Sequence, residues 1–165
     1  MKKVSLFVDV QNIYYTTRSA YGRSFDYNRF WAQVTNGREI VQASAYAIGR
    51  GDEKQMQFQN ILRAIGFEVK LKPYIQRSDG SAKGDWDVGL TLDVIEAAAH
   101  TDIIVLASGD GDFDMLLKRA SQRYCVETEV YGVPGLTANS LINAATRYMP
   151  IDEYLLLGKN PSAHS

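Results

Sequence analysis

The sequence predicts an α/β fold in three layers, with a central, mostly parallel sheet of about five strands and helices on both faces. Short apolar segments alternate with amphipathic ones, which is the pattern of parallel strands joined by helices. Residues 103–107 are all apolar and rich in β-branched side chains, as expected for a strand buried on both faces. Directly after them, Phe113, Leu116, Leu117 and Ala120 recur with the spacing of one helix face.

The other strands are predicted from shorter apolar or alternating segments. Residues 4–8 are apolar, residues 40–48 and 67–75 alternate loosely, and residues 126–131 follow the helix that begins near Phe113. The strand predicted over residues 67–75 contains lysines and a proline, which are typical of a strand at the edge of a sheet.

Helices are expected where apolar residues recur every three or four positions. In the fourth helix, Val88, Leu92, Ile95 and Ala99 are predicted to form one face, and Gly66 is expected to end the third helix. Two helices are expected to begin at the capping residues Asn12 and Asp26. Four further helices are expected over residues 58–65, 88–99, 113–123 and 141–145.

The chain is expected to form one domain, residues 1–158, followed by a frayed tail at 159–165. Residues 76–84 are polar and lack any period, so a mobile loop is predicted there. We find no internal repeat and no linker long enough to separate two domains.

Composition excludes several classes of protein. The net charge of −1 excludes a strongly basic protein that coats nucleic acid, although a local basic patch remains compatible with it. The single cysteine, Cys125, excludes a disulfide framework and a zinc finger, and we expect it to be buried. The apolar segment before Asp9 is too short for a signal peptide, and no apolar run approaches the ~20 residues that span a bilayer. A cytoplasmic protein without a membrane segment is expected.

Acidic side chains gather where the predicted strands end. Asp9 ends the first strand, Asp110 and Asp112 follow the buried strand, and Asp85 and Asp87 precede the fourth helix. The carboxyl ends of parallel strands form one edge, where ligands bind. Two carboxylates about 4 Å apart repel by roughly 4 kcal/mol at an effective dielectric of 20, and Mg²⁺ or Mn²⁺ would offset this repulsion. Each aspartate taken alone could instead cap a helix.

Other phosphate-handling classes fit less well. A phosphoaspartyl phosphatase usually has an acid at the position of Gln11, and a receiver domain has an aspartate where this chain has residues 74–76. Neither a dinucleotide-binding glycine motif nor a P-loop occurs.

Three motifs together resemble those of the NYN domain, specifically its bacterial LabA-like branch within the PIN-like nucleases. They are FVDVQN at 7–12, KGDWDVGLTLD at 83–93 and SGDGDF at 108–113. The resemblance extends from Val4 to about Tyr154. It implies a Rossmann-like, PIN-like fold and hydrolysis of RNA phosphodiester bonds by a water that Mg²⁺ or Mn²⁺ activates.

The resemblance also implies roles for individual residues. Asp85 is a further candidate ligand, and the choice between it and Asp87 stays open. Asp93 matches a recurrent acidic position, but it is about 600° of helix beyond Asp87, so a structural role is expected. The implied catalytic and metal-binding acids are Asp9, Asp87, Asp110 and Asp112.

Substrate contacts are expected around these acids. Trp86 is interpreted either as a stacking platform or as a plug over the sheet. Bases of single-stranded RNA could stack on an interleaved aromatic and basic group after Asp9, namely Tyr14, Tyr15, Arg18, Tyr21 and Arg23, which could also be core and solvated residues. The candidate substrate-binding residues are Asn12, Arg77, Lys83 and Ser108.

The sequence therefore predicts a metal-dependent ribonuclease that acts on RNA. Two alternatives remain: a non-catalytic module that binds RNA or protein on the same fold, and a metal-dependent phosphohydrolase of small nucleotides. The oligomeric state is left open, with a homodimer among the options.

Overall fold

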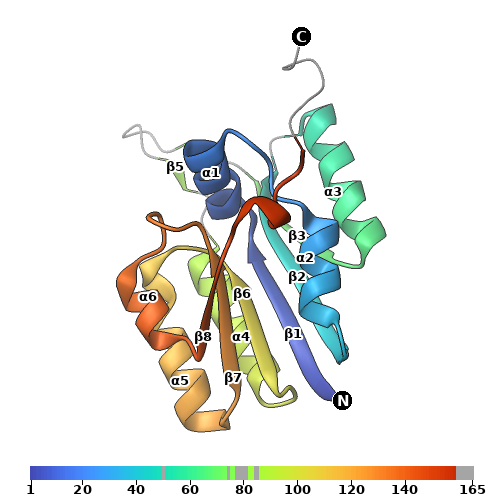
Figure 1. Ribbon diagram of the computed structural model, residues 1–165. Helices are drawn as coiled ribbons and strands as arrows, with labels where there is room; N and C mark the ends of the chain where they lie inside the picture. Colours follow the sequence, from blue (N-terminus) through green and yellow to red (C-terminus); the bar gives the residue numbers. More distant parts are fainter. Residues whose placement is uncertain (50, 74, 77–81, 84–85, 159–165) are drawn as a thin grey trace.

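Six parallel strands form the central sheet of the computed structural model (Figure 1). The structure describes residues 1–49, 51–73, 75–76, 82–83 and 86–158. The strands are β1 (Lys2–Asp9), β2 (Arg38–Gly49), β3 (Glu68–Pro73), β6 (Ile103–Ala107), β7 (Glu127–Gly132) and β8 (Arg147–Pro150). Their order across the sheet is β3-β2-β1-β6-β7-β8, and each pairs in parallel with its neighbours, so all carboxyl ends reach the same edge.

Helices cover both faces of this sheet, as predicted. The first three pack on one face and the other three on the opposite face (Figure 1). The helices are α1 (Val10–Tyr21), α2 (Tyr27–Thr35), α3 (Glu53–Ile65), α4 (Asp87–Ala98), α5 (Asp114–Tyr124) and α6 (Asn139–Ala144), with short 3-10 helices η1 (Gly111–Phe113) and η2 (Glu153–Leu155). The predicted three-layer α/β fold is confirmed.

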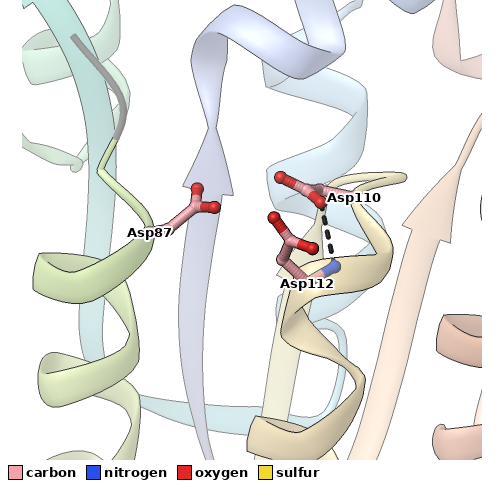
Figure 2. Close-up of side chains that lie close together, drawn as sticks. All are labelled: Asp87, Asp110 and Asp112. Atoms are coloured by element: carbon pink, nitrogen blue, oxygen red, sulfur yellow. Dashed lines mark hydrogen bonds between the residues drawn. The ribbon is translucent and has the colours of Figure 1, made fainter. Parts of the chain in front are cut away.

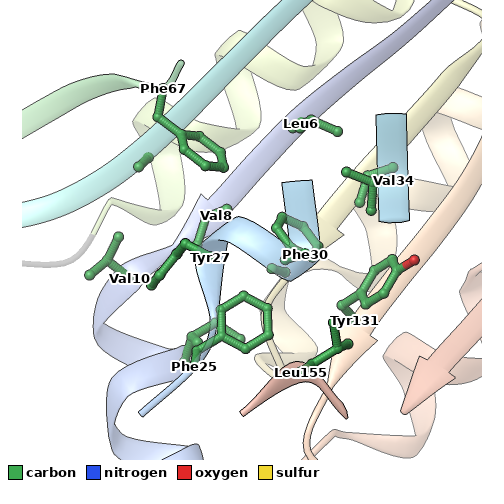
Figure 3. Close-up of a cluster of buried hydrophobic side chains, with 14 of the residues drawn as sticks. Leu6, Val8, Val10, Phe25, Tyr27, Phe30, Val34, Phe67, Tyr131 and Leu155 are labelled. Atoms are coloured by element: carbon green, nitrogen blue, oxygen red, sulfur yellow. The ribbon is translucent and has the colours of Figure 1, made fainter. Parts of the chain in front are cut away.

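The core has two apolar layers because side chains alternate across each strand. Leu6 and Val8 of β1 face α1 and α2, where Phe30 packs edge-on against Tyr131 of β7 (Figure 3). Phe7 faces the opposite way, toward α4 and α5. Strand β6 is completely buried, which confirms the prediction made for residues 103–107.

The sheet has one more strand than expected. Strand β8 was not predicted because its four residues are only partly buried, so its sequence carries no continuous apolar signal. It pairs with β7 at the end of the sheet. The edge position predicted for the strand that includes Pro73 is confirmed, since β3 pairs only with β2 in the central sheet.

The predicted loop 76–84 lies partly outside the described residues. Its described parts include strands β4 (Ile75–Gln76) and β5 (Ala82–Lys83), which pair antiparallel as a separate two-stranded sheet. Where the structure describes it, the third strand spans Glu68–Pro73, and Ile75 belongs to β4.

Three local expectations are wrong. Asp9, and not Asn12, caps α1. On α4 the buried residues include Leu90 and Val94, whereas Val88 and Leu92 are mostly exposed, at 70% and 65%. This helix is apolar around most of its circumference, so periodicity could not orient it. Cys125, the C-cap of α5 in the left-handed conformation (φ 58°), is exposed and not buried. No helix among the residues placed by the structure is long and apolar enough to span a membrane.

A buried carboxylate on β7 pairs with arginines at the amino ends of β2 and β8. Glu129 of β7 is only 4% exposed and accepts two hydrogen bonds from Arg38, at 3.0 and 2.8 Å, while Arg147 lies 3.4 Å away.

Replacing Glu129 by alanine leaves Arg38 without its carboxylate, so we expect unfolding free energy to fall by about 3 kcal/mol. Denaturant unfolding measures the loss. Glu127→Ala is the matched control, because its pair with Lys2 is exposed and should contribute less than about 1 kcal/mol; equal losses would contradict the prediction.

Candidate functional site

The site begins where β1 and β6 end side by side. Val8 of β1 is in register with Ala107 of β6, so Asp9 and Ser108 emerge as neighbours. The hydroxyl of Ser108 donates a hydrogen bond to Asp9 Oδ2 (3.1 Å) and accepts one from the backbone N–H of Asp110 (3.1 Å). Ser108 is completely buried, so its hydroxyl makes its contacts within the protein and links the two acidic turns.

A second link joins helix α1 to the same turn. Asn12 Oδ1 accepts a hydrogen bond from the buried backbone N–H of Gly109 (2.8 Å), and the Asn12 N–H donates to Asp9 Oδ1 (3.3 Å). Gly109 must be glycine at this point, because a Cβ there would collide with the carbonyl oxygen of Leu136. The acidic turn is therefore held by β1, α1 and the segment that precedes α6.

Three carboxylates converge above these links. Asp87 is the first residue of α4, and Asp110 and Asp112 flank the start of η1 (Figure 2). One oxygen from each lies within 4.8 Å of the other two. Asp110 Oδ1 also accepts the N–H of Asp112 (2.9 Å), which fixes its orientation. The side chains of Asp87 and Asp110 are half-buried and that of Asp112 is exposed.

A cavity of about 240 Å³ opens beside this trio. Asp9 lines it together with Asp87 and Asp110, but the Asp9 carboxylate is not part of the group that converges within 4.8 Å. The remaining lining residues come from α1, the end of β2 and the start of α4; they are Gln11, Asn12, Tyr15, Tyr46, Ile48 and Trp86.

The electrostatics of the trio favour a cation. Among the described residues, neither Asp110 nor Asp112 forms an ion pair with a lysine or arginine. The N-terminal ends of α1, α4 and η1, at Asp9, Asp87 and Asp110, all lie at this edge, and their partial positive charges offset part of the repulsion between carboxylates. Clustered carboxylate oxygens are the donors that Mg²⁺ and Mn²⁺ prefer.

One wall of the cavity is aromatic. Trp86 packs edge-on against Tyr46 (5.3 Å between ring centroids), and its Nε1–H donates to the carbonyl of Ala47 (2.8 Å). The Tyr46 hydroxyl donates to Asp93 (2.7 Å), which also pairs with Lys70 (2.7 Å). Burial first, and then the bond to Asp93, raise the pKa of Tyr46, so it stays protonated. The structural role predicted for Asp93 is confirmed.

Sequence reasoning missed Tyr46 as a residue of this cavity. It lies inside β2, in a segment whose apolar neighbours indicated only a core strand. Its position near the carboxyl end of a parallel strand was the one available signal.

Other predicted residues lie apart from the trio or outside the described structure. Asp85 and Arg77 lie outside the described residues; for Lys83 the backbone is described, in β5, but not the side chain. Of the aromatic and basic group on α1 and after it, Tyr14 and Tyr15 are half exposed, at 51% and 52%. The rest of the group is mixed: Arg18 lies over the ring of Tyr14, Tyr21 donates to the carbonyl of Ile151, and Arg23 pairs with Glu153.

The hydrogen bond between Asn12 and Gly109 allows a test of how the site is held. In Asn12→Ala the buried N–H of Gly109 loses its acceptor, so we expect unfolding free energy to fall by about 1–3 kcal/mol. Urea unfolding measures the change. Gln11→Ala, which removes an exposed neighbouring side chain, is the control and should change stability little. An Asn12→Ala variant as stable as the control would contradict the proposed link.

Comparison with known proteins places the chain in a family. The chain matches the NYN domain over residues 3–152. It is 29% identical over 161 residues to the low amplitude and bright protein LabA of Synechococcus elongatus, an alignment that covers 92% of this chain and 84% of LabA.

Two solved structures resemble this chain in fold. The crystal structure of protein VPA0982 from Vibrio parahaemolyticus superposes with a TM-score of 0.91 at 57% identity, covering 94% of this chain and 96% of that one. Ribokinase from Giardia lamblia shares the fold alone, with a TM-score of 0.50 and 13% identity over 90% of this chain and 57% of its own. From the match over residues 3–152, the chain belongs to the NYN domain family.

Proposed function

We propose that this protein is a ribonuclease that hydrolyses RNA phosphodiester bonds with Mg²⁺ or Mn²⁺ at the acidic trio. One observation carries the proposal: Asp87, Asp110 and Asp112 bring carboxylate oxygens within 4.8 Å of one another at the carboxyl edge of a NYN domain. NYN domains belong to the PIN-like nucleases, and RNA is the substrate that this membership favours.

The donor set suits the proposed ion. Three carboxylates on two different elements approach one another, and two of them have no cationic side chain as a partner among the residues described. An ion held by a few carboxylates keeps open positions for phosphate oxygens and water, which is the requirement for phosphodiester hydrolysis. Asp87, Asp110 and Asp112 would hold the ion.

The remaining polar residues would position the reactants. Asp9 lines the cavity, and hydrogen bonds from Asn12 and Ser108 fix its two oxygens. We assign to it the orientation of the attacking water, through a hydrogen bond that the water donates to the Asp9 carboxylate. Ser108 and Asn12 would then act by holding Asp9 and the acidic turn.

Single-stranded RNA is the substrate form that the surroundings favour. The half-exposed rings of Tyr14 and Tyr15 lie on α1, directly after Asp9, and Tyr15 also lines the acidic cavity. Unpaired bases stack on such rings, whereas paired bases are enclosed in a duplex. Arg77 and Lys83, which precede α4 in sequence, remain the candidate contacts to RNA phosphates.

Metal binding can be tested without measuring activity. Mn²⁺ that binds only the folded protein stabilises it by about 2.7 kcal/mol at a hundredfold excess over its dissociation constant. We expect a Mn²⁺-dependent rise in the unfolding temperature of the wild type, and a smaller rise for Asp112→Asn. Glu96→Gln, an exposed acid further along α4, should respond like the wild type. Equal responses from all three proteins would contradict binding at the trio.

Cleavage tests the reaction itself. Asp110→Asn removes a central carboxylate, so we expect Mn²⁺-dependent cleavage of a labelled single-stranded RNA to fall to the level of the wild type in EDTA. Circular dichroism should show the fold retained, and Glu96→Gln should cleave normally. Wild-type activity in Asp110→Asn would refute the site. Metal binding without any RNA cleavage would support a non-catalytic module, and cleavage of mononucleotides alone would support a phosphohydrolase.

A further inference from the structure

A second, larger cavity adjoins the acidic one. It measures about 660 Å³ and lies between α1, the start of α2 and the inner face of α3. Gln11, Tyr15 and Ile48 line both cavities, so the two spaces are neighbours on either side of these residues. A ligand that extends from the acidic trio in this direction would enter the larger cavity.

Most of the walls are apolar or aromatic. Phe25 and Phe58 contribute, and both pack edge-on against Tyr27, at 5.0 and 5.6 Å between ring centroids. Tyr14 and Tyr15, half exposed and in edge-on contact with each other at 5.4 Å, also line it. A flat, largely apolar ligand would fit such walls.

Two mostly buried side chains, Gln59 and Tyr27, present polar atoms to this cavity. Gln59 is 6% exposed and Tyr27 is 8% exposed, and both line the cavity. Within the part of the chain that the structure describes, neither the Gln59 amide nor the Tyr27 hydroxyl makes a hydrogen bond. By contrast, the amide of Gln55 on the same helix donates to the carbonyl of Ile48. Among the described residues, only the Ser5 hydroxyl is a fully buried polar atom without a partner, so the polar atoms of Gln59 and Tyr27 are open to the cavity. They are therefore available to the polar edge of a ligand that enters it.

The charges in the cavity limit what that ligand can be. Among the described lining residues, Asp26 and Asp52 outnumber the one cation, Lys54, which disfavours a phosphate and favours a neutral group. Tyr27 can donate a hydrogen bond at any physiological pH, because burial and the nearby Asp9 raise its pKa. The Gln59 amide offers both donors and an acceptor.

We propose that this cavity binds one nucleobase of the RNA, with the Gln59 amide and the Tyr27 hydroxyl hydrogen-bonded to the edge of the base. The inference rests on the proposed function, since the phosphodiester would occupy the adjoining acidic cavity while its neutral base enters the larger one. Bases combine apolar faces with a donor and acceptor edge, which is the combination that these walls and polar groups complement.

Binding of free nucleosides tests the subsite without metal or cleavage. The probes are adenosine, guanosine, cytidine and uridine in EDTA, and binding is followed by ligand-observed NMR and titration calorimetry. We expect saturable binding that distinguishes among the four. Gln59→Leu and Tyr27→Phe should each weaken the preferred nucleoside roughly fivefold to tenfold, the effect of losing one hydrogen bond. Tyr27→Phe retains the packed ring, so it remains informative if Gln59→Leu folds poorly.

Matched variants supply the controls. Gln57→Leu changes an exposed glutamine of the same helix, and Tyr124→Phe changes a tyrosine of α5 that does not line the cavity; both should bind like the wild type. Absence of nucleoside binding, or equal binding by all variants, would overturn the subsite. The same holds if the apolar dye anilinonaphthalene sulfonate binds while no nucleoside does.

The experiments distinguish failure of the base site from failure of the proposed ribonuclease activity. Cleavage that is lost in Asp110→Asn, together with no nucleoside binding, would retain the ribonuclease and remove the base site. Nucleoside binding that depends on Gln59 and Tyr27, together with no RNA cleavage, would retain the base site and remove the ribonuclease.

Discussion

The parallel pairing of β1 with β6 is the constraint on which the candidate site depends. Both strands are buried on both faces along most of their length, so their register is fixed by packing on either side. That register brings Asp9 beside Ser108, and one buried hydroxyl then connects the Asp9 carboxylate to the N–H of Asp110. A shift of one residue would reverse every side chain of β1 across the sheet and separate these groups. The acidic site is thus a consequence of the core.

Helix starts make the crowding of acids tolerable. Asp87 opens α4, Asp110 caps η1 and Asp112 lies in the first turn of η1, so each carboxylate of the trio lies at a helix start that carries partial positive charge. This compensation is incomplete, because each helix end contributes about half an elementary charge against a full charge on the carboxylate. The remaining negative potential is what would attract a divalent ion. The fold therefore tolerates the trio without an ion and still favours one.

The sequence predicted the parts of the structure in which local pattern and burial agree. Residues 103–107 and the helix face of Phe113 and Leu117 were predicted correctly because in these segments the apolar residues of the pattern are the ones that the structure buries. The orientation of α4 was not found, since Val88 and Leu92 follow the same helical spacing as buried residues although they are exposed. In the candidate site, aspartates at strand ends were visible as a pattern. The polar side chains of the larger cavity, Gln59 and Tyr27, could not be predicted from the sequence. They stand out only once their burial and their lack of hydrogen bonds within the described structure are both known.

The two adjoining cavities differ in charge and polarity in a way that suits the two halves of a nucleotide. The acidic cavity would take the phosphodiester only with a cation present, since carboxylates repel phosphate. Among the described residues, two aspartates and one lysine line the larger cavity and its walls are mainly apolar, so it disfavours phosphate. Tyr15 and Ile48 line both spaces. A nucleotide placed across them would have its base toward α3 and its phosphate toward Asp110. On this arrangement, recognition of the base fixes the phosphodiester relative to Asp9 before any chemistry begins.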